Sequence, residues 1–242
     1  MQKLNDRRVI VTGAGAGVGA ATVTAAANHG ALVTALDINE SVLSQPSDTV
    51  SSRTLDVSSQ AHWEAFANTL DSASVDHLHL NAGIQSAPPE APLESYAFKN
   101  LSIPHYRRMM GVNVDGVVLG LHYLLPKMKA GGSIVVTCSL AGIVPYEIDP
   151  LYSMSKHAVT GLVRSLKGEL AERKLRINAL CPGGIDTEII PHAQRTDMAE
   201  FMTPEAIADE IIKLFLTEES GATWAKVSEA KPAWIIHPPG KR

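Results

Sequence analysis

Apolar and polar positions along the 242-residue chain form two kinds of segment. Short runs that are apolar along their whole length are typical of strands buried on both faces of a sheet. Longer segments with apolar residues three and four apart are typical of helices that pack on a sheet. The predicted strands are 9–11, 32–36, 50–55, 75–80, 133–138, 176–181 and 223–227. The predicted helices are 19–29, 60–70, 106–128, 151–172 and 204–216.

This alternation of strands and helices predicts an α/β fold with a doubly wound, mostly parallel seven-stranded sheet, Rossmann-like, with helices on both faces. Such sheets bind ligands at the carboxyl ends of their strands, where the strand order reverses. We expect Ser58 to cap the second helix and Pro204 to open the last one. A single domain over residues 1–242 is expected, with a proline-rich tail from about residue 228.

Composition and charge narrow the classes of partner. The net charge is −4 and the charged residues are scattered, so no basic stripe indicates a nucleic-acid partner. No run approaches the roughly 18 apolar residues of a membrane helix, and the first apolar segment breaks at Gly13, too early for a secretory signal. Cys138 and Cys181 lie in apolar strands and indicate reduced thiols of a cytoplasmic protein. The nine histidines show no clustered ligand spacing, so no metal is expected.

A glycine-rich segment, Thr-Gly-Ala-Gly-Ala-Gly-Val-Gly at 12–19, follows the first predicted strand. Glycine has no Cβ atom, so the backbone can turn sharply and approach a pyrophosphate closely. The helix that starts here offers free N–H groups and the positive end of its dipole. An ordinary glycine-rich turn is the alternative, but the strand before it, the helix after it and an acid ending the second strand together predict a dinucleotide site.

That acid, Asp37, lies 18 residues beyond Gly19, close to the spacing of about 20 for a carboxylate that binds the ribose hydroxyls. A carboxylate at this place would repel the 2′-phosphate of NADP, and Ala14, Ala16 and Ile38 supply no cation nearby to offset the repulsion. We therefore expect NAD as the cofactor. The alternative is that Asp37 is a surface acid that happens to end a strand.

Six motifs in the right order resemble those of the short-chain dehydrogenase/reductase family over residues 8–216. They include the glycine segment, Asn-Ala-Gly at 81–83, Tyr-x-x-x-Lys at 152–156 and Pro-Gly at 182–183. The resemblance implies that Asp56 and Val57 contact the adenine and Thr187 the carboxamide. Together, motif and resemblance predict the cofactor-binding residues Gly13, Gly15, Ala16, Gly17, Val18, Gly19, Asp37, Ile38, Asp56, Val57, Asn81, Ala82, Gly83, Tyr152, Lys156, Pro182, Gly183, Ile185 and Thr187.

The resemblance also implies four catalytic residues: Asn113, Ser139, Tyr152 and Lys156. Oxidising an alcohol needs a base for the hydroxyl proton, and free tyrosine, with a pKa near 10, is a poor one at neutral pH. Tyr152 and Lys156 are four residues apart and share a helix face, so the ammonium is expected to lower the pKa of the phenol. Ser139 would hydrogen-bond the substrate oxygen, and Asn113 would hold a water near the lysine.

A tyrosine and a lysine four residues apart are commonplace, and a serine after a strand is commonly only part of a turn. Ser139 nevertheless precedes Tyr152 by 13 residues, as in the family, which favours the catalytic interpretation. His105 and His157 are the rival acid–base candidates, because histidine titrates near neutral pH.

The substrate is predicted from the expected walls of the pocket. Ser139, Pro145, Tyr146, Tyr152 and Gly183 are the predicted substrate-binding residues, and the wall that they form is mainly apolar. A hydrophobic secondary alcohol, such as a cyclic, aryl or terpenoid one, is expected. Acidic and histidine side chains at 147, 149 and 192 leave sugars and hydroxy acids open. The segment 188–202, where the family has a lid, is short and indicates an open pocket.

Two segments depart from the family pattern. The loop at 85–103 is longer than usual, and it is either a surface insertion or part of the substrate wall. The proline-rich tail carries Trp234-Ile235-Ile236, which we expect to pack on a neighbouring subunit or to cover the pocket, since an exposed apolar run is a liability. Leu80 stands where the family often has a second asparagine. Family members are usually dimers or tetramers, so a homo-oligomer is expected.

Three functions are compatible with these patterns. The leading one is an NAD-dependent oxidoreductase that interconverts a secondary alcohol and a ketone. The second is an NADP-linked reductase of a lipid or acyl intermediate, against which Asp37 argues. The third is a non-catalytic NAD(H)-binding sensor or scaffold, against which the four catalytic residues argue.

Overall fold

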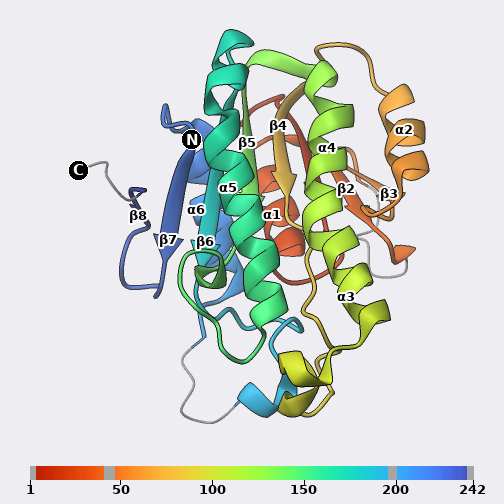
Figure 1. Cartoon of the computed structure of the whole chain (residues 1–242). Helices are drawn as coiled ribbons and strands as arrows, with labels where there is room; N and C mark the ends of the chain where they lie inside the picture. Colours follow the sequence, from red (N-terminus) through yellow and green to blue (C-terminus); the bar gives the residue numbers. More distant parts are fainter. Residues whose placement is uncertain (1–3, 41–46, 196–200, 239–242) are drawn as a thin grey trace.

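The computed structural model describes residues 4–40, 47–195 and 201–238 of the chain. Its described strands form one sheet in the order β3-β2-β1-β4-β5-β6-β7-β8. Every neighbouring pair is parallel except β7 and β8, which are antiparallel. The strands are β1 (Arg8–Thr12), β2 (Leu32–Asp37), β3 (Val50–Thr54), β4 (Val75–Leu80), β5 (Met128–Thr137), β6 (Arg176–Pro182), β7 (Ala222–Lys226) and β8 (Trp234–Ile235). The doubly wound, mostly parallel sheet is therefore confirmed (Figure 1).

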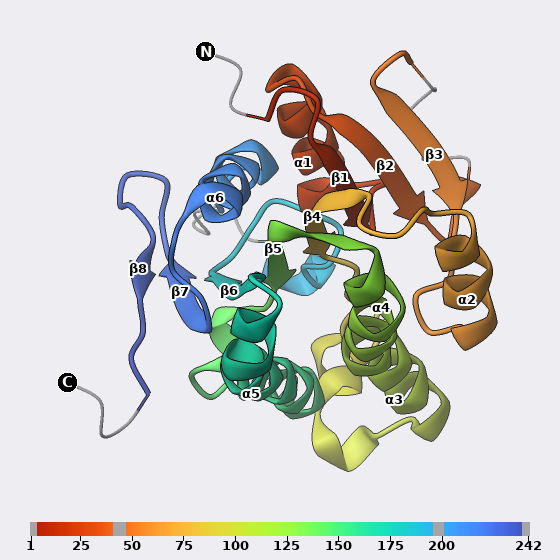
Figure 2. The same ribbon diagram turned by 90° about the horizontal axis from the view of Figure 1, so that it is seen from above.

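Helices cover both faces of this sheet, as Figure 2 shows along the strands. The helices α1 (Gly17–Asn28) and α6 (Pro204–Leu216) pack against one another on one face. The other face carries α2 (Gln60–Asn68), α4 (Gly116–Leu124) and α5 (Pro150–Glu172), while α3 (Ile103–Met110) continues α4 towards the carboxyl ends of the strands. This arrangement is the helix–sheet–helix sandwich of a doubly wound fold.

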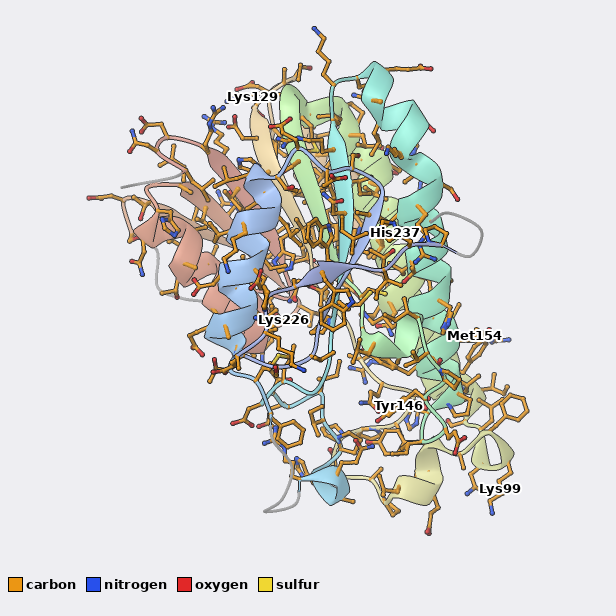
Figure 3. The ribbon with its side chains drawn as sticks, turned by 90° about the vertical axis from the view of Figure 1, so that its left-hand side faces the viewer. Lys99, Lys129, Tyr146, Met154, Lys226 and His237 are labelled. Carbon is orange, nitrogen blue, oxygen red and sulfur yellow. The ribbon has the colours of Figure 1, made fainter. Side chains whose placement is uncertain are left out.

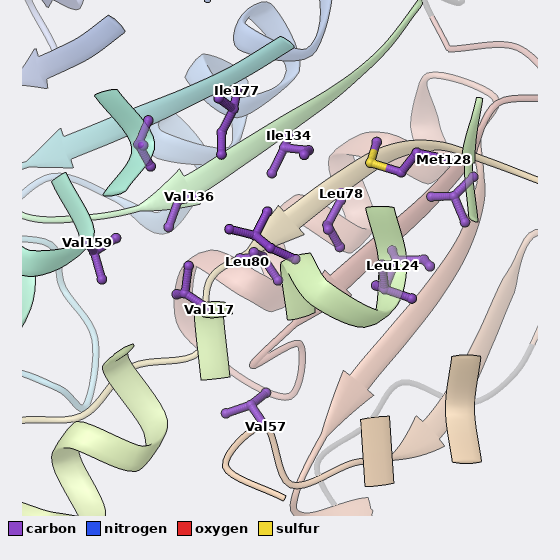
Figure 4. Close-up of a cluster of buried hydrophobic side chains, with 14 of the residues drawn as sticks. Val57, Leu78, Leu80, Val117, Leu124, Met128, Ile134, Val136, Val159 and Ile177 are labelled. Atoms are coloured by element: carbon purple, nitrogen blue, oxygen red, sulfur yellow. The ribbon is translucent and has the colours of Figure 1, made fainter. Parts of the chain in front are cut away.

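The apolar interior is divided by the sheet into two cores. One core joins strand residues such as Leu78, Ile134 and Ile177 to Val117 of α4 and Val159 of α5 (Figure 4). The other core lies beneath α1 and α6. The central strands bury side chains on both faces, and β4 is buried at all six positions although Asp76, His77 and His79 make up half of it.

Helix starts differ in detail from the sequence-based prediction. Ser59, and not Ser58, caps α2: its side chain accepts a hydrogen bond from the backbone of His62. The Ser58 hydroxyl instead donates to Asp56 Oδ1 at 2.7 Å, which places it in the turn before the helix. At α6, Thr203 is the cap and Pro204 takes the first helical position, as predicted.

The predicted helix 106–128 is interrupted. It begins earlier, at Ile103, passes through a π-helical turn at Gly111–Asp115 and continues as α4. It ends at Leu124, because Pro126 cannot donate the backbone hydrogen bond that an α-helix needs. Met128, predicted to close the helix, is instead the first residue of β5. Single π turns inside helices are frequent at functional sites, and this one carries Asn113.

The tail adds an eighth strand, so the prediction of seven strands falls one short. Trp234–Ile235 pairs with β7, with Trp224 opposite Ile235. The buried Lys226 ammonium fixes the loop between the two strands by donating to the Lys231 carbonyl at 2.7 Å and to Glu210 Oε1 at 3.2 Å. The Trp-Ile pair thus extends the edge of its own sheet (Figure 1). Neither residue lines the cavity, so the pair does not cover the pocket, while its packing on a neighbouring subunit stays a prediction. Figure 3 shows Lys226 and His237 on either side of this segment. Residues 239–242 of this tail lie outside the described residues.

Candidate active site

A cavity of about 700 Å³ opens at the carboxyl ends of the strands. It begins where β1 and β4, which are not consecutive in sequence, pair with one another, so it occupies the point at which the strand order reverses. This is the position that the sheet topology predicts for a ligand. Segments that follow β1, β4, β5 and β6 supply most of its lining.

The glycine turn after β1 forms one end of the cavity. Gly13 and Gly17 have φ angles of +61° and +51°, which favour glycine. A Cβ atom on Gly19 would lie 1.9 Å from the Gly13 carbonyl oxygen, and one on Gly17 would lie 2.8 Å from Thr187 Cγ2. These three positions therefore exclude any larger side chain. The packing at Gly17 also brings Thr187, predicted to contact the cofactor, against the turn.

The N-terminus of α1 faces this end of the cavity. Ala16, at the cap position, has no side chain that could bind the free N–H groups of the first turn. Ala16, Gly17 and Val18 all line the cavity. Free N–H groups, a positive dipole end and a close backbone approach fit a pyrophosphate group. The predicted Gly15 is not among the lining residues, and its N–H donates to Asp37 Oδ2 at 3.0 Å.

Asp37 lies at the end of β2 and lines the cavity. Each carboxylate oxygen accepts one backbone hydrogen bond, from Gly15 N and from Asn39 N, both at 3.0 Å. Each oxygen keeps a lone pair for a further donor, such as a ribose hydroxyl. Ile38 is exposed and does not line the cavity.

Asp56 and Val57 also lie outside the cavity lining. Asp56 Oδ1 accepts hydrogen bonds from the N–H and the hydroxyl of Ser58. Val57 is buried, and its side chain packs so closely on α4 that only glycine fits at position 116. The roles of Asp56 and Val57 in binding adenine stay predictions.

Asn81 fastens the glycine turn to the strands beside it. Its N–H donates to Thr12 Oγ1 at 2.9 Å, and its side-chain amide donates to the carbonyls of Thr12 and Gly13 at 3.2 and 3.3 Å. Its amide oxygen accepts from Thr137 Oγ1 at 3.1 Å. Asn81 thereby joins β1, β4 and β5 at the edge where the cavity opens.

Asn113 connects α3 and α4 to the segment after β4. Its side chain is buried, accepts from Ile84 N at 2.9 Å and donates to Ile84 O at 2.8 Å and to Ser155 Oγ at 3.0 Å. It does not line the cavity, but a Cβ on Gly83 would lie 3.5 Å from Asn113 Oδ1 and 3.2 Å from Lys156 Nζ. Asn113 and Lys156 therefore flank the same small gap at Gly83.

Lys156 reaches the cavity from α5. Its ammonium donates to the Thr137 carbonyl at 3.1 Å, and it lies 5.6 Å from the centre of the Tyr152 ring. The side chain is 3% exposed. This burial lowers the pKa of Lys156, because the charged form loses its hydration.

Tyr152 and Ser139 complete the set. Tyr152 lines the cavity, and burial raises the pKa of its phenol, while its hydrogen bond with Ser139 lowers that pKa. The burial effect is the larger, so the phenol is protonated at neutral pH. The Lys156 Nζ lies 5.6 Å from the centre of the Tyr152 ring and donates to the Thr137 carbonyl. The expectation that this ammonium lowers the Tyr152 pKa stays a prediction.

Asp149 positions the start of α5, whereas the sequence analysis considered it only as a group that could recognise a polar substrate. Its buried carboxylate accepts from Tyr152 N at 3.0 Å, from Ser86 N at 2.9 Å and from Ser86 Oγ at 2.8 Å. These bonds fix both the first turn of the helix and the loop after β4. Because its oxygens are committed to these partners, Asp149 is a structural residue and not a free group for recognising a polar substrate.

The proline-rich loop forms part of the cavity wall, which answers the question that the sequence left open. Gln85, Ser86, Ala87, Pro88 and Pro89 line the cavity, while residues further along form two short 3-10 turns. The sequence analysis left the substrate wall as one of two alternatives, since no pattern distinguishes it from a surface loop.

Tyr146, from the segment before α5, lines the same end of the cavity, and its hydroxyl is hydrogen-bonded to the side-chain amide of Gln194. Its ring lies edge-on to that of Tyr152, with centroids 6.3 Å apart. Figure 3 shows Tyr146 at the edge where the loops gather. Pro145, by contrast, is exposed and does not line the cavity. Of the expected lid, residues 196–200 lie outside the described part of the chain.

Most of the remaining predicted residues meet at the cavity. Besides Ala16, Gly17, Val18, Asp37, Tyr146, Tyr152 and Lys156, the predicted residues that line it are Gly13, Asn81, Ala82, Gly83, Ser139, Pro182, Gly183, Ile185 and Thr187. The rival His157 does not line it, and its Nδ1 is hydrogen-bonded to the Ser153 carbonyl at 2.9 Å. The other rival, His105, lies on α3 and does line the cavity.

The described residues also bear on two other features, a metal site and a membrane-spanning helix. Among residues 4–40, 47–195 and 201–238, no cluster of three or more histidine, cysteine or acidic side chains could hold a metal ion. Within the same ranges, no helix is long and apolar enough to cross a membrane.

Comparisons with known proteins agree with this geometry. A family model described as short chain dehydrogenase matches residues 7–197. Cyclohexanol dehydrogenase from Acinetobacter sp. (strain SE19) is 29% identical over 235 residues, which are 90% of this chain and 90% of that protein. A 2,5-dichloro-2,5-cyclohexadiene-1,4-diol dehydrogenase from Sphingobium indicum is 33% identical over 206 residues, which are 81% of this chain and 80% of that protein.

A solved structure shares the fold. The 3-ketoacyl-(acyl-carrier-protein) reductase from Brucella melitensis, complexed with NADH, superposes with a TM-score of 0.80 at 24% identity and covers 93% of this chain and 98% of its own. At this level of identity the likeness concerns the backbone architecture.

Proposed function

Because the chain belongs to the short-chain dehydrogenase/reductase family, and is thus an alcohol/ketone oxidoreductase, we propose that it interconverts a cyclic secondary alcohol and the corresponding ketone with NAD. The single observation that carries the proposal is the meeting of Ser139, Tyr152 and Lys156 in one cavity with the glycine turn. Relatives named for ring alcohols support the substrate class, as does the apolar wall of the cavity.

Tyr152 is proposed to transfer the proton. Its phenol is protonated at neutral pH, so in the direction of ketone reduction it can donate to the carbonyl oxygen without prior activation. Ser139 is proposed to hydrogen-bond the same oxygen and hold it beside the phenol. When bound, the nicotinamide ring gives or takes the hydride. In the oxidative direction the phenol must first lose its proton, which the positive charges of the Lys156 ammonium and of the oxidised nicotinamide, when bound, would favour.

Lys156 and Asn113 are proposed to return the proton to solvent. Both flank the gap at Gly83. The Lys156 ammonium donates one hydrogen bond to Thr137 O, which leaves two N–H donors for other partners. The side-chain amide of Asn113 is hydrogen-bonded to the backbone of Ile84 and to the Ser155 hydroxyl. These bonds fix the position of the segment after β4, which forms the gap.

The preference for NAD is proposed on the basis of Asp37. With no cation bonded to it among the described residues, its carboxylate favours ribose hydroxyls and disfavours a 2′-phosphate. We expect kcat/KM with NAD to exceed that with NADP by about tenfold or more, which corresponds to about 1.4 kcal/mol. The Asp37→Ser variant should narrow the ratio. A wild-type preference for NADP would contradict this assignment and favour the NADP-linked reductase.

The catalytic proposal is tested with a panel of secondary alcohols followed by NADH absorbance. Tyr152→Phe should lower kcat by about 10²–10⁴-fold, the usual contribution of a positioned acid or base, while NADH binding, measured by fluorescence titration, persists. Tyr123→Phe, on α4 and away from the cavity, is the matched control and should keep its activity. Equal turnover in Tyr152→Phe and wild type would refute the role of Tyr152. NADH binding without turnover of any alcohol would favour a sensor or scaffold.

We also propose a cytoplasmic homo-oligomer, a dimer or a tetramer. The long helices α4 and α5 each leave a large apolar side chain exposed, with Val118 at 45% and Met154 at 43%. The cysteines at 138 and 181 are free and buried, which fits a reducing compartment. Light scattering coupled to size-exclusion chromatography tests the assembly, and a monomeric mass at micromolar concentration would contradict it.

A further inference from the structure

An unpaired cation lies in the substrate end of the cavity. Arg108 and His105 are three residues apart on α3, and both line the cavity. Residues three apart on a helix lie on the same face, so their side chains can approach one ligand together. All three side chains at 105, 107 and 108 are exposed, but the neighbouring Arg107 does not line the cavity.

The position of α3 assigns these two residues to the substrate end. Tyr106, Met109 and Met110 of α3 pack in one cluster with Tyr146 and Tyr152. Figure 1 places α3 beyond α4, at the edge to which the arrowheads of the strands point. The helix α3 therefore lies beside Tyr152, and Arg108 and His105 line the cavity from an adjacent face of the same helix.

The Arg108 guanidinium has no acidic partner of its own. Among the described residues, no carboxylate oxygen lies within the ion-pair distance of Arg108, although six other arginine and lysine side chains form such pairs. The one acid in this part of the lining is Glu188, whose Oε2 lies 3.6 Å from His192 Nε2. The Arg108 side chain is exposed and borders a lining made mostly of apolar side chains, so its guanidinium is available to pair with an anion carried by a ligand.

We propose that Arg108, assisted by His105, binds a carboxylate carried by the substrate, so that the preferred substrates are cyclic hydroxy acids. This inference rests on the proposed function and names its substrate class. A guanidinium offers two parallel N–H donors to a carboxylate, and the imidazole of His105 supplies a further N–H in either protonation state. The anchored carboxylate fixes the ring in the cavity, and the hydroxyl on the far side of the ring then faces Tyr152 and Ser139.

The experiment compares 4-hydroxycyclohexanecarboxylate with its methyl ester and with cyclohexanol, all with NAD. The acid and the ester have the same ring and hydroxyl and differ in charge. We expect kcat/KM for the acid to exceed that for the ester by about tenfold or more, the size of one charge-assisted hydrogen-bonded contact, mostly through a lower KM. Arg108→Gln should remove this preference, Arg108→Lys should keep part of it, and Arg107→Gln should leave it unchanged.

The outcomes separate the two proposals. Wild-type turnover of cyclohexanol and the ester with no preference for the acid overturns the carboxylate site and leaves the proposed function standing. The same holds if Arg108→Gln lowers kcat/KM for acid and ester by equal factors, because the arginine then acts on the fold or on the cofactor. Failure of all three compounds to be oxidised overturns both proposals.

Discussion

Removal of the Asp149 carboxylate provides a strict test of how the catalytic helix is held. In Asp149→Ala, α5 loses its N-cap, which costs about 1 kcal/mol. The N–H and hydroxyl of Ser86 lose their buried acceptor, at about 1–3 kcal/mol each. Because the variant no longer buries a charge, we expect the lower end of the sum, a loss of about 3–4 kcal/mol in the free energy of unfolding. Urea denaturation followed by circular dichroism measures it.

Two further variants isolate the cause. Ser86→Ala combined with Asp149→Ala forms a double-mutant cycle, and we expect a coupling energy of about 1–2 kcal/mol because the two side chains bond directly. Glu147→Ala, exposed in the same segment, is the control and should change stability by less than about 0.5 kcal/mol. Since Asp149 also accepts from Tyr152 N, kcat should fall in Asp149→Ala. A loss below about 1 kcal/mol with no coupling would refute this account of the loop and the helix.

Three other changes probe features outside the catalytic set. Gly19→Ala should abolish NADH binding or folding, as judged by fluorescence titration and circular dichroism, because its Cβ would lie 1.9 Å from the Gly13 carbonyl. Burial lowers the pKa of His79 to about 3, below its usual 6.5, so the unfolded chain binds this proton first. The contribution of His79 to the free energy of unfolding should therefore be fully present above pH 6.5 and be lost as the pH falls towards 3. Urea titrations at several pH values between these limits should show that the free energy of unfolding of His79→Gln depends on pH less steeply than that of the wild type, by about 1.4 kcal/mol per pH unit. Lys226→Met should destabilise the chain by about 3 kcal/mol in urea, because it leaves the largely buried Glu210 without its buried cation, and an unchanged midpoint would contradict that role.

Local patterns accounted for the architecture and the catalytic set. Several strands were visible because a sheet covered on both faces favours continuous apolar runs, such as 9–11 in β1 and 134–136 in β5. Tyr152 and Lys156 were recognisable as candidates through the resemblance to the family, because a tyrosine and a lysine four residues apart are commonplace on their own. The cofactor turn was recognisable because glycines there replace side chains for which the backbone leaves no room.

What the sequence did not reveal depends on contacts between distant residues or on very short elements. Ser86 and Asp149 are 63 residues apart, and nothing in the sequence near either of them marks the pair. Trp234–Ile235 forms a strand of two residues, too short for any periodicity, and only its pairing with β7 defines it. The choice of Ser59 over Ser58 as the cap of α2 was equally hidden, since both serines suit the position and the Asp56 carboxylate decides between them.

The π turn at Gly111–Asp115 sets the rotation of α3 relative to α4. Each residue of an α-helix advances the chain by about 100° around the axis, so removing one residue from this turn would restore α-helical pairing and rotate everything before it by about that angle. Arg108 and His105 would then leave the cavity, while α4 kept its packing on the sheet. A one-residue insertion or deletion at this point would thus exchange the side chains that α3 presents to the substrate and would also repack its cluster with Tyr152, so that helix register at this turn couples specificity to the support of the catalytic tyrosine.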